Sequence, residues 1–74
     1  MNDADLVRLV DGLEDAADGY LTLAEIEAAA GEDLTPAVAA ELLLVDHRTR
    51  LDGSAVTLCR LNRHHPLVME LTGW

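Results

Sequence analysis

The segment LCRLNRHHPLV, Leu58 to Val68, concentrates the side chains that could bind a metal ion. It holds the only cysteine, Cys59, and two of the three histidines, His64 and His65. A thiolate and two imidazoles are a ligand set that zinc accepts. Adjacent histidines do not readily face one centre, however, and the proline after His65 favours extended backbone. Cys59 is instead expected in the core, so the sequence predicts no metal and no cofactor here.

A calcium loop is the second candidate for metal chemistry. EDAADGYLTLAE, Glu14 to Glu25, has the length of an EF-hand loop, with Gly19 and Glu25 at the expected places. Its first position is Glu14 rather than aspartate, and its third is Ala16, whose side chain cannot coordinate a cation. Glu25 also fits a helix cap, so we expect no bound calcium.

Catalytic chemistry has no recognisable signature in the chain. No nucleophile–histidine–carboxylate set and no glycine-rich phosphate loop occurs in its usual sequence context. A chain of 74 residues also leaves little room for a concave substrate pocket. The protein is therefore not expected to be an enzyme.

Charge is divided unevenly along the chain, whose net charge is -9. Residues 1–47 carry twelve acidic side chains and one arginine, whereas residues 48–74 carry four arginines and two acidic side chains. The overall negative charge disfavours nonspecific attraction to nucleic acid or anionic lipid. The last third of the chain, with its four arginines, is the part that could bind phosphate groups.

Periodicity and turn residues predict the elements that would position these groups. Leucine and valine spacing predicts a first helix that ends at Asp18-Gly19. Thr22 to Glu25 form a capping box for the second helix, which Gly31 ends, and Thr35 with Pro36 starts the third. Asp52-Gly53-Ser54 is a hairpin turn. The expected helices, wing hairpin and tail occupy residues 3–17, 22–30, 35–47, 48–62 and 63–74.

This order resembles a winged helix-turn-helix over nearly the whole chain. The segments that carry the resemblance are GYLTLAEIEAAAG and RTRLDGSAVTLCRLNRHHPLV, and the second is similar to the wing and exit of ArsR-like transcriptional regulators. The resemblance implies a single domain over residues 1–74, mainly α with a small β-hairpin. It also implies a third helix that enters the major groove of DNA and a wing that contacts phosphates.

The nucleic-acid contacts implied by the resemblance are four arginines and a neutral hydroxyl. They are Thr35, Arg48, Arg50, Arg60 and Arg63. Arg60 and Arg63 are expected to point outward, from the outgoing strand of the wing and just past it. The exposed start of the third helix would present Ala37, Ala39, Ala40 and Glu41, which offer few donors to base edges. The expected function is a small DNA-binding transcriptional regulator. The alternative is an acidic protein–protein interaction module, or a DNA-mimic-like inhibitor, that binds a basic protein.

Homodimerisation is expected because the core, with few aromatic side chains, has a small volume. The chain has no phenylalanine, and a domain of this size buries only about 60% of its unfolded surface. The apolar side chains expected to be exposed for protein contact are Leu6, Leu13, Leu67, Met69, Leu71 and Trp74. Neither a signal peptide nor an apolar run of about 20 residues is visible. A cytoplasmic protein without membrane contact is therefore expected.

Overall fold

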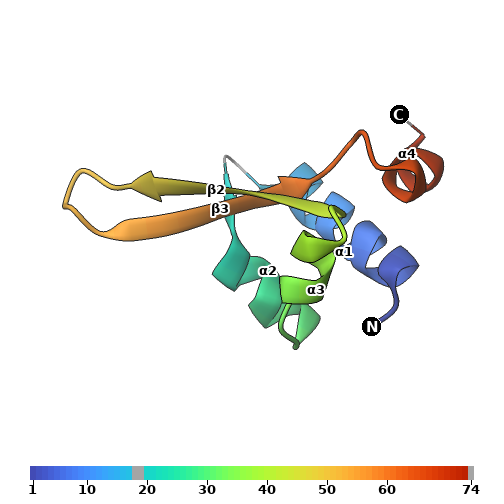
Figure 1. Ribbon diagram of the computed structural model, residues 1–74, viewed down its shortest axis with the longest axis horizontal. Helices are drawn as coiled ribbons and strands as arrows, with labels where there is room; N and C mark the ends of the chain where they lie inside the picture. Colours follow the sequence, from blue (N-terminus) through green and yellow to red (C-terminus); the bar gives the residue numbers. More distant parts are fainter. Residues whose placement is uncertain (18–19, 74) are drawn as a thin grey trace.

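The computed structural model describes residues 1–17 and 20–73, which form four helices and a three-stranded antiparallel sheet (Figure 1). The fold class is therefore α+β. Along the chain the elements are α1 (Asp3–Ala16), β1 (Leu21–Thr22), α2 (Leu23–Ala30), α3 (Thr35–Ala39), β2 (Leu43–Thr49), β3 (Ala55–Leu61) and α4 (Pro66–Thr72). None of the helices in these described ranges has the length and apolar character needed to cross a membrane.

The starts of α1 and α2 follow from local capping chemistry. The Asn2 Oδ1 accepts a hydrogen bond of 2.8 Å from the Asp5 N–H, which begins α1. The predicted cap at Thr22 is confirmed, because its Oγ1 accepts from the Glu25 N–H at 3.1 Å. Helix α2 ends at Gly31, as predicted, and this glycine adopts the left-handed conformation with φ 73°. The predicted helix stop at Asp18-Gly19 lies outside the described residues.

The prediction of a third helix over residues 35–47 is wrong. Helix α3 ends at Ala39, and the chain is already extended at Leu43. Glu41 adopts a left-handed backbone with φ 62°. The Glu41 N–H donates to the Val38 carbonyl at 3.1 Å, and the Leu42 N–H donates to the Ala37 carbonyl at 3.0 Å. This pair of bonds is a Schellman motif, which terminates the helix without a glycine.

The start of α3 also differs from the prediction. Thr35 is the first helical residue rather than the cap, which falls at Leu34 and lacks a side-chain hydrogen bond. The Thr35 hydroxyl and N–H both donate to Asp33 Oδ1, at 2.7 and 2.9 Å. These bonds lower the pKa of the Asp33 carboxyl. Asp33 therefore shapes the turn before α3.

The hairpin is confirmed, but its first arm begins five residues before the predicted Arg48, at Leu43. Strands β2 and β3 pair from Leu43 opposite Leu61 to Thr49 opposite Ala55, and β1 lies on the other side of β3. At the tip, Gly53 has φ 89°, which a side chain would disfavour.

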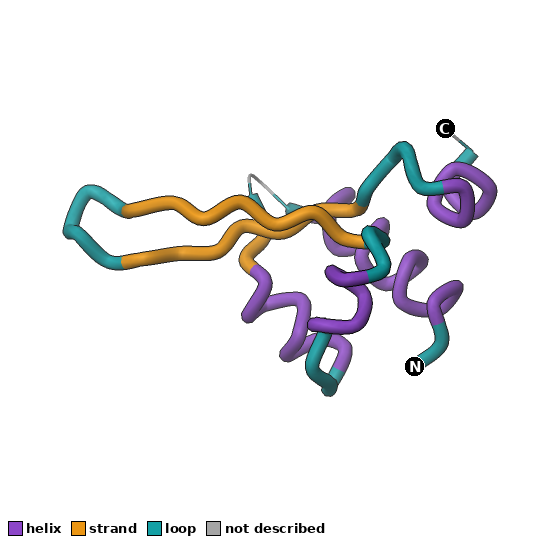
Figure 2. The backbone as a smooth tube through the Cα atoms, in the orientation of Figure 1, coloured by secondary structure: helices purple, strands orange, loops and turns teal. Residues whose placement is uncertain are grey.

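The helices cover one face of the sheet, here called the inner face, and leave the other, the outer face, uncovered (Figures 1 and 2). The buried side chains on the inner side are Leu6, Val7, Val10, Leu21, Ile26, Leu34, Ala37, Leu42, Leu43, Cys59, Leu61 and Val68. Residues 46–55 project beyond this core and are all exposed. We call them the hairpin arm.

The tail contains α4, which lies beside α1 (Figure 1). Val68 on this helix is fully buried. The His65 Nδ1 accepts a hydrogen bond of 3.1 Å from the Leu67 N–H and so caps α4. His65 therefore has a structural role that its sequence context left open.

Candidate functional site

Two of the predicted phosphate-binding arginines lie on the outer face of the sheet. In the β2–β3 register, Arg60 stands opposite Leu44 and Arg48 stands opposite Val56. These residues alternate with the inward Cys59 and so project from the uncovered side. The Arg48 Nε donates to Asp46 Oδ2 at 2.7 Å, and this bond raises the pKa of Arg48. The positive charge of Arg48 is thus partly offset by a neighbour.

The other two predicted phosphate-binding arginines, Arg50 and Arg63, do not lie beside them on the outer face. Arg50 lines a recess of about 340 Å³ between the hairpin arm and α2, together with Thr22 and Glu27. Arg63 lies beyond β3 with only 24% of its side chain exposed, so the prediction that it points outward is wrong. The four arginines therefore do not form one basic surface. Helix α3 packs on the inner side of the sheet (Figure 1), whereas Arg48 and Arg60 project from the outer face.

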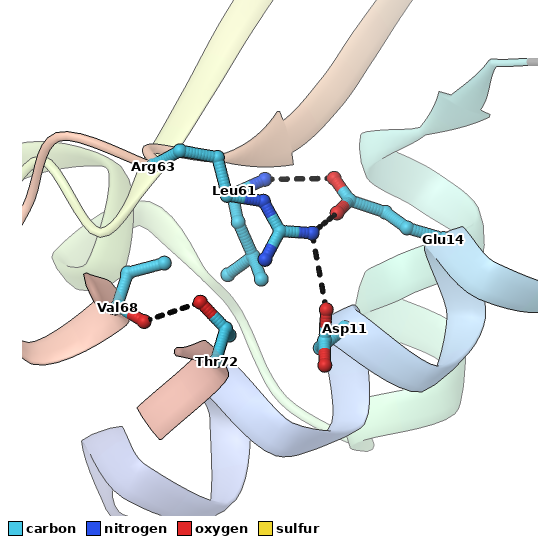
Figure 3. Close-up of polar contacts among 6 residues, drawn as sticks. All are labelled: Asp11, Glu14, Leu61, Arg63, Val68 and Thr72. Carbon is cyan, nitrogen blue, oxygen red and sulfur yellow. Dashed lines mark hydrogen bonds and ion pairs between the residues drawn. The ribbon is translucent and has the colours of Figure 1, made fainter. Parts of the chain in front are cut away.

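Arg63 belongs to an ion-pair network that ties the exit of β3 to α1 (Figure 3). Its Nη2 donates to Asp11 Oδ1 at 3.0 Å and to Glu14 Oε2 at 2.6 Å. The second Glu14 oxygen, Oε1, accepts from the Leu61 N–H at 2.9 Å. The sequence carries no signal for this cluster, because its partners lie about fifty residues apart.

The short α3 offers little to a nucleic-acid base. Ala37 was expected to be exposed but is buried in the core. The exposed positions at this helix and its exit are Thr35, Pro36, Ala39, Ala40 and Glu41. The Thr35 hydroxyl is already engaged by Asp33. This surface has few free donors, and its one charged group is negative.

The outer face carries a shallow recess of about 340 Å³ that the sequence did not predict. Tyr20, Leu44, Leu58, Asp46 and Arg60 supply side chains to its lining. Tyr20 is 84% exposed, which is unusual for a large aromatic side chain, whereas Leu44 and Leu58 are half-buried. Exposed apolar groups with a polar rim are typical of a binding surface. The three apolar residues come from separate segments, so only the folded sheet brings them together.

No family model, curated protein or solved structure matches the chain. Any functional assignment therefore depends on the geometry of the described residues.

The residues predicted for protein contact divide into three groups. Leu6 is buried within the chain's own core, so its predicted exposure is wrong. Leu13, Leu67 and Leu71 are partly buried against that core, and Met69 is 44% exposed on α4. Trp74 lies outside the described residues. Met69 is therefore the member of this set that the structure leaves most accessible.

Metal coordination is not supported within residues 1–17 and 20–73, where no group of three or more candidate ligands comes together. Cys59 is buried, as predicted, on the strand face that it shares with Leu61. Glu14, the first residue of the calcium-loop candidate, is instead bound to Leu61 and Arg63. The Gly19 position of that candidate loop falls outside the described part of the chain.

Cys59 should react slowly with thiol reagents in the folded protein. Burial, with smaller contributions from the charges of Glu14 and Glu27, raises the pKa of its thiol to about 11. At pH 8 the thiolate fraction should fall about 100-fold relative to the unfolded chain, and burial should slow the reaction further. Because the neutral thiol is favoured by folding, this residue's contribution to stability should be lost as pH rises from about 9 towards 11.

The measurement is the rate of modification by a chromogenic disulfide with and without denaturant. Cys59→Ser supplies the blank, because the chain has no other thiol. Rapid modification without denaturant would show that the thiol is accessible.

Proposed function

We propose that this chain is a small winged-helix-type domain that works by binding another protein. The order α1-β1-α2-α3-β2-β3, with β3 in the centre of the sheet, supports the winged-helix assignment. In this proposal α3 serves as a packing element of the core, because it is too short and too poor in donors to read bases.

The observation that carries the proposal is the outer-face recess around Tyr20. Helices cover the inner face, while Tyr20, Leu44 and Leu58 present apolar surface to solvent on the uncovered side. A large apolar side chain of a partner would fill the recess and remove this surface from water. The net charge of -9 selects a partner segment that is basic overall and disfavours acidic ones.

Tyr20→Ala should therefore abolish capture of a discrete basic protein from nuclease-treated host lysate. Tyr20 is highly exposed, so this change should leave the fold intact. Leu51→Ala is the matched control, because Leu51 is another highly exposed large apolar residue, at the hairpin tip and away from the recess. Capture should weaken with added salt, since a basic partner is held partly by charge. Equal capture by the wild type and the Tyr20 variant would contradict the proposal.

A second candidate function is DNA binding through the hairpin arm, as the winged-helix resemblance implies. The specific observation in its favour is that Arg48 and Arg50 are exposed on a projecting hairpin, with exposed Arg60 on the adjoining outer face. Retention on heparin and a salt-sensitive gel shift, both lost when these three arginines become alanine, would favour it. No gel shift by the wild type at low salt would eliminate it and leave protein binding.

A further inference from the structure

Strand β2 lies at one edge of the sheet. The side of β2 that points away from β3, here called its free edge, has no strand partner within the described residues. It is seven residues long, and from Asp46 onward it lies on the exposed hairpin arm (Figure 2). An exposed edge strand is a template for pairing with another strand unless something blocks it. The backbone and side chains of β2 decide which strand fits.

The two ends of the hairpin fix which backbone groups of β2 point outward. The Arg50 N–H donates to the Ser54 carbonyl at 2.8 Å, and the Asn62 N–H donates to the Leu42 carbonyl at 2.9 Å. In an antiparallel ladder every second residue bonds to the same neighbour. The even-numbered residues therefore bond to β3, which leaves the N–H and carbonyl groups of the odd-numbered ones at the free edge. These are Leu43, Val45, His47 and Thr49.

The side chains on either side of His47 have opposite charges. Asp46 precedes it and Arg48 follows it, both on the outer face and both more than half exposed. In an antiparallel copy of β2 centred on His47, Asp46 of each chain stands opposite Arg48 of the other. These positions fall between the hydrogen-bonded pairs, where opposing side chains approach most closely. The strand is thus complementary to itself in both backbone and charge.

Neighbouring registers lack this complementarity. A pairing centred on Asp46 sets the two copies of that carboxylate opposite each other, and one centred on Arg48 does the same with two guanidinium groups. Like charges directly opposite destabilise a strand pair. The charges of the edge therefore select the register centred on His47.

We propose that two copies of the chain associate through their β2 edges, antiparallel and centred on His47, to form one continuous sheet. The contact goes beyond the proposed function: it uses the free edge of β2, whereas the Tyr20 recess lies on the outer face and shares Asp46 with it. It also replaces the dimer surface expected from Leu6, which is buried in the core. A strand pair covers less than the roughly 800 Å² per partner of a stable complex, so we expect a dissociation constant between about 10 µM and 1 mM.

Charge reversal tests the register by sedimentation equilibrium of the full chain up to about 1 mM, the upper bound of that range. Asp46→Arg places arginine opposite arginine, and Arg48→Asp places carboxylate opposite carboxylate, so each variant alone should dimerise at least about tenfold more weakly. An equimolar mixture of the two variants restores opposite charges at both positions and should recover a heterodimer. The double exchange, Asp46→Arg with Arg48→Asp, should again form a homodimer.

Arg60→Asp is the matched control, because Arg60 lies on the same face but on the central strand. This variant should therefore dimerise as the wild type does. Circular dichroism establishes that each variant is folded. Tyr20→Ala should leave dimerisation unchanged, so failure of the protein-binding proposal would not affect this result. A wild type that stays monomeric at about 1 mM, or a mixture of the two single variants that does not recover association, would overturn the proposal.

Discussion

Replacing Leu61 with alanine is expected to lower the free energy of unfolding by about 3 kcal/mol. Leu61 is 1% exposed and stands opposite Leu43, which is equally buried, at the base of the hairpin. Truncation removes the apolar contacts that the Leu61 side chain makes in the core and leaves a cavity. The paired strand backbone cannot move far enough to close that cavity. In a domain of 74 residues this loss is a large share of the total stability.

Leu51→Ala provides the same chemical change without burial. Leu51 is fully exposed at the hairpin tip, so its truncation should change stability by no more than about 0.5 kcal/mol. Urea denaturation followed by circular dichroism measures both variants against the wild type. Similar losses at the two positions would mean that the base of the hairpin is not packed as described.

Local chemistry made part of this fold predictable. The cap at Thr22 and the stop at Gly31 each depend on a few adjacent residues, and both are confirmed. The turn at Asp52-Gly53 is likewise local: the Ser54 N–H and hydroxyl bind the Asp52 carboxylate, and Gly53 supplies a positive φ. Such signals are readable because the interacting groups are neighbours in the sequence.

The third helix could not be placed correctly because the contact that decides where it ends joins residues distant in the sequence. Val38, Leu42 and Val45 have helical spacing, but the apolar run Leu42 to Val45 fits a buried strand equally well. The strand is favoured because Leu43 pairs with Leu61, a residue distant in sequence. The helix stop is also hidden, since Glu41 adopts the left-handed conformation that usually identifies a glycine.

The candidate site was predictable only in part. Cys59 and Arg60 face inward and outward as the strand alternation predicts. Tyr20, in contrast, meets Leu44 and Leu58 only after the sheet has formed, so no local pattern points to the recess. Arg63 follows the strand, where alternation no longer fixes direction, and its carboxylate partners lie on α1.

Replacing Arg63 with alanine is expected to lower the free energy of unfolding by about 2 kcal/mol. The change leaves Asp11 and Glu14 close together without their shared cation, and Glu14 is only 22% exposed. Loss of one partner from a fully buried ion pair costs about 3 to 5 kcal/mol, and partial exposure reduces that figure. Arg60→Ala, three residues earlier and exposed, should cost no more than about 0.5 kcal/mol.

A double-mutant cycle with Glu14→Ala separates the ion pair from the rest of the network. Glu14→Ala alone should cost at least as much as Arg63→Ala, because it also removes the acceptor of the Leu61 N–H. The two changes together should cost less than their sum by about 1 kcal/mol, since they delete one shared interaction. Glu14→Gln keeps an acceptor oxygen and should fall between the wild type and Glu14→Ala. Additive losses would show that the guanidinium and the carboxylate stabilise the protein independently, and would leave the Leu61 hydrogen bond as the main tie between β3 and α1.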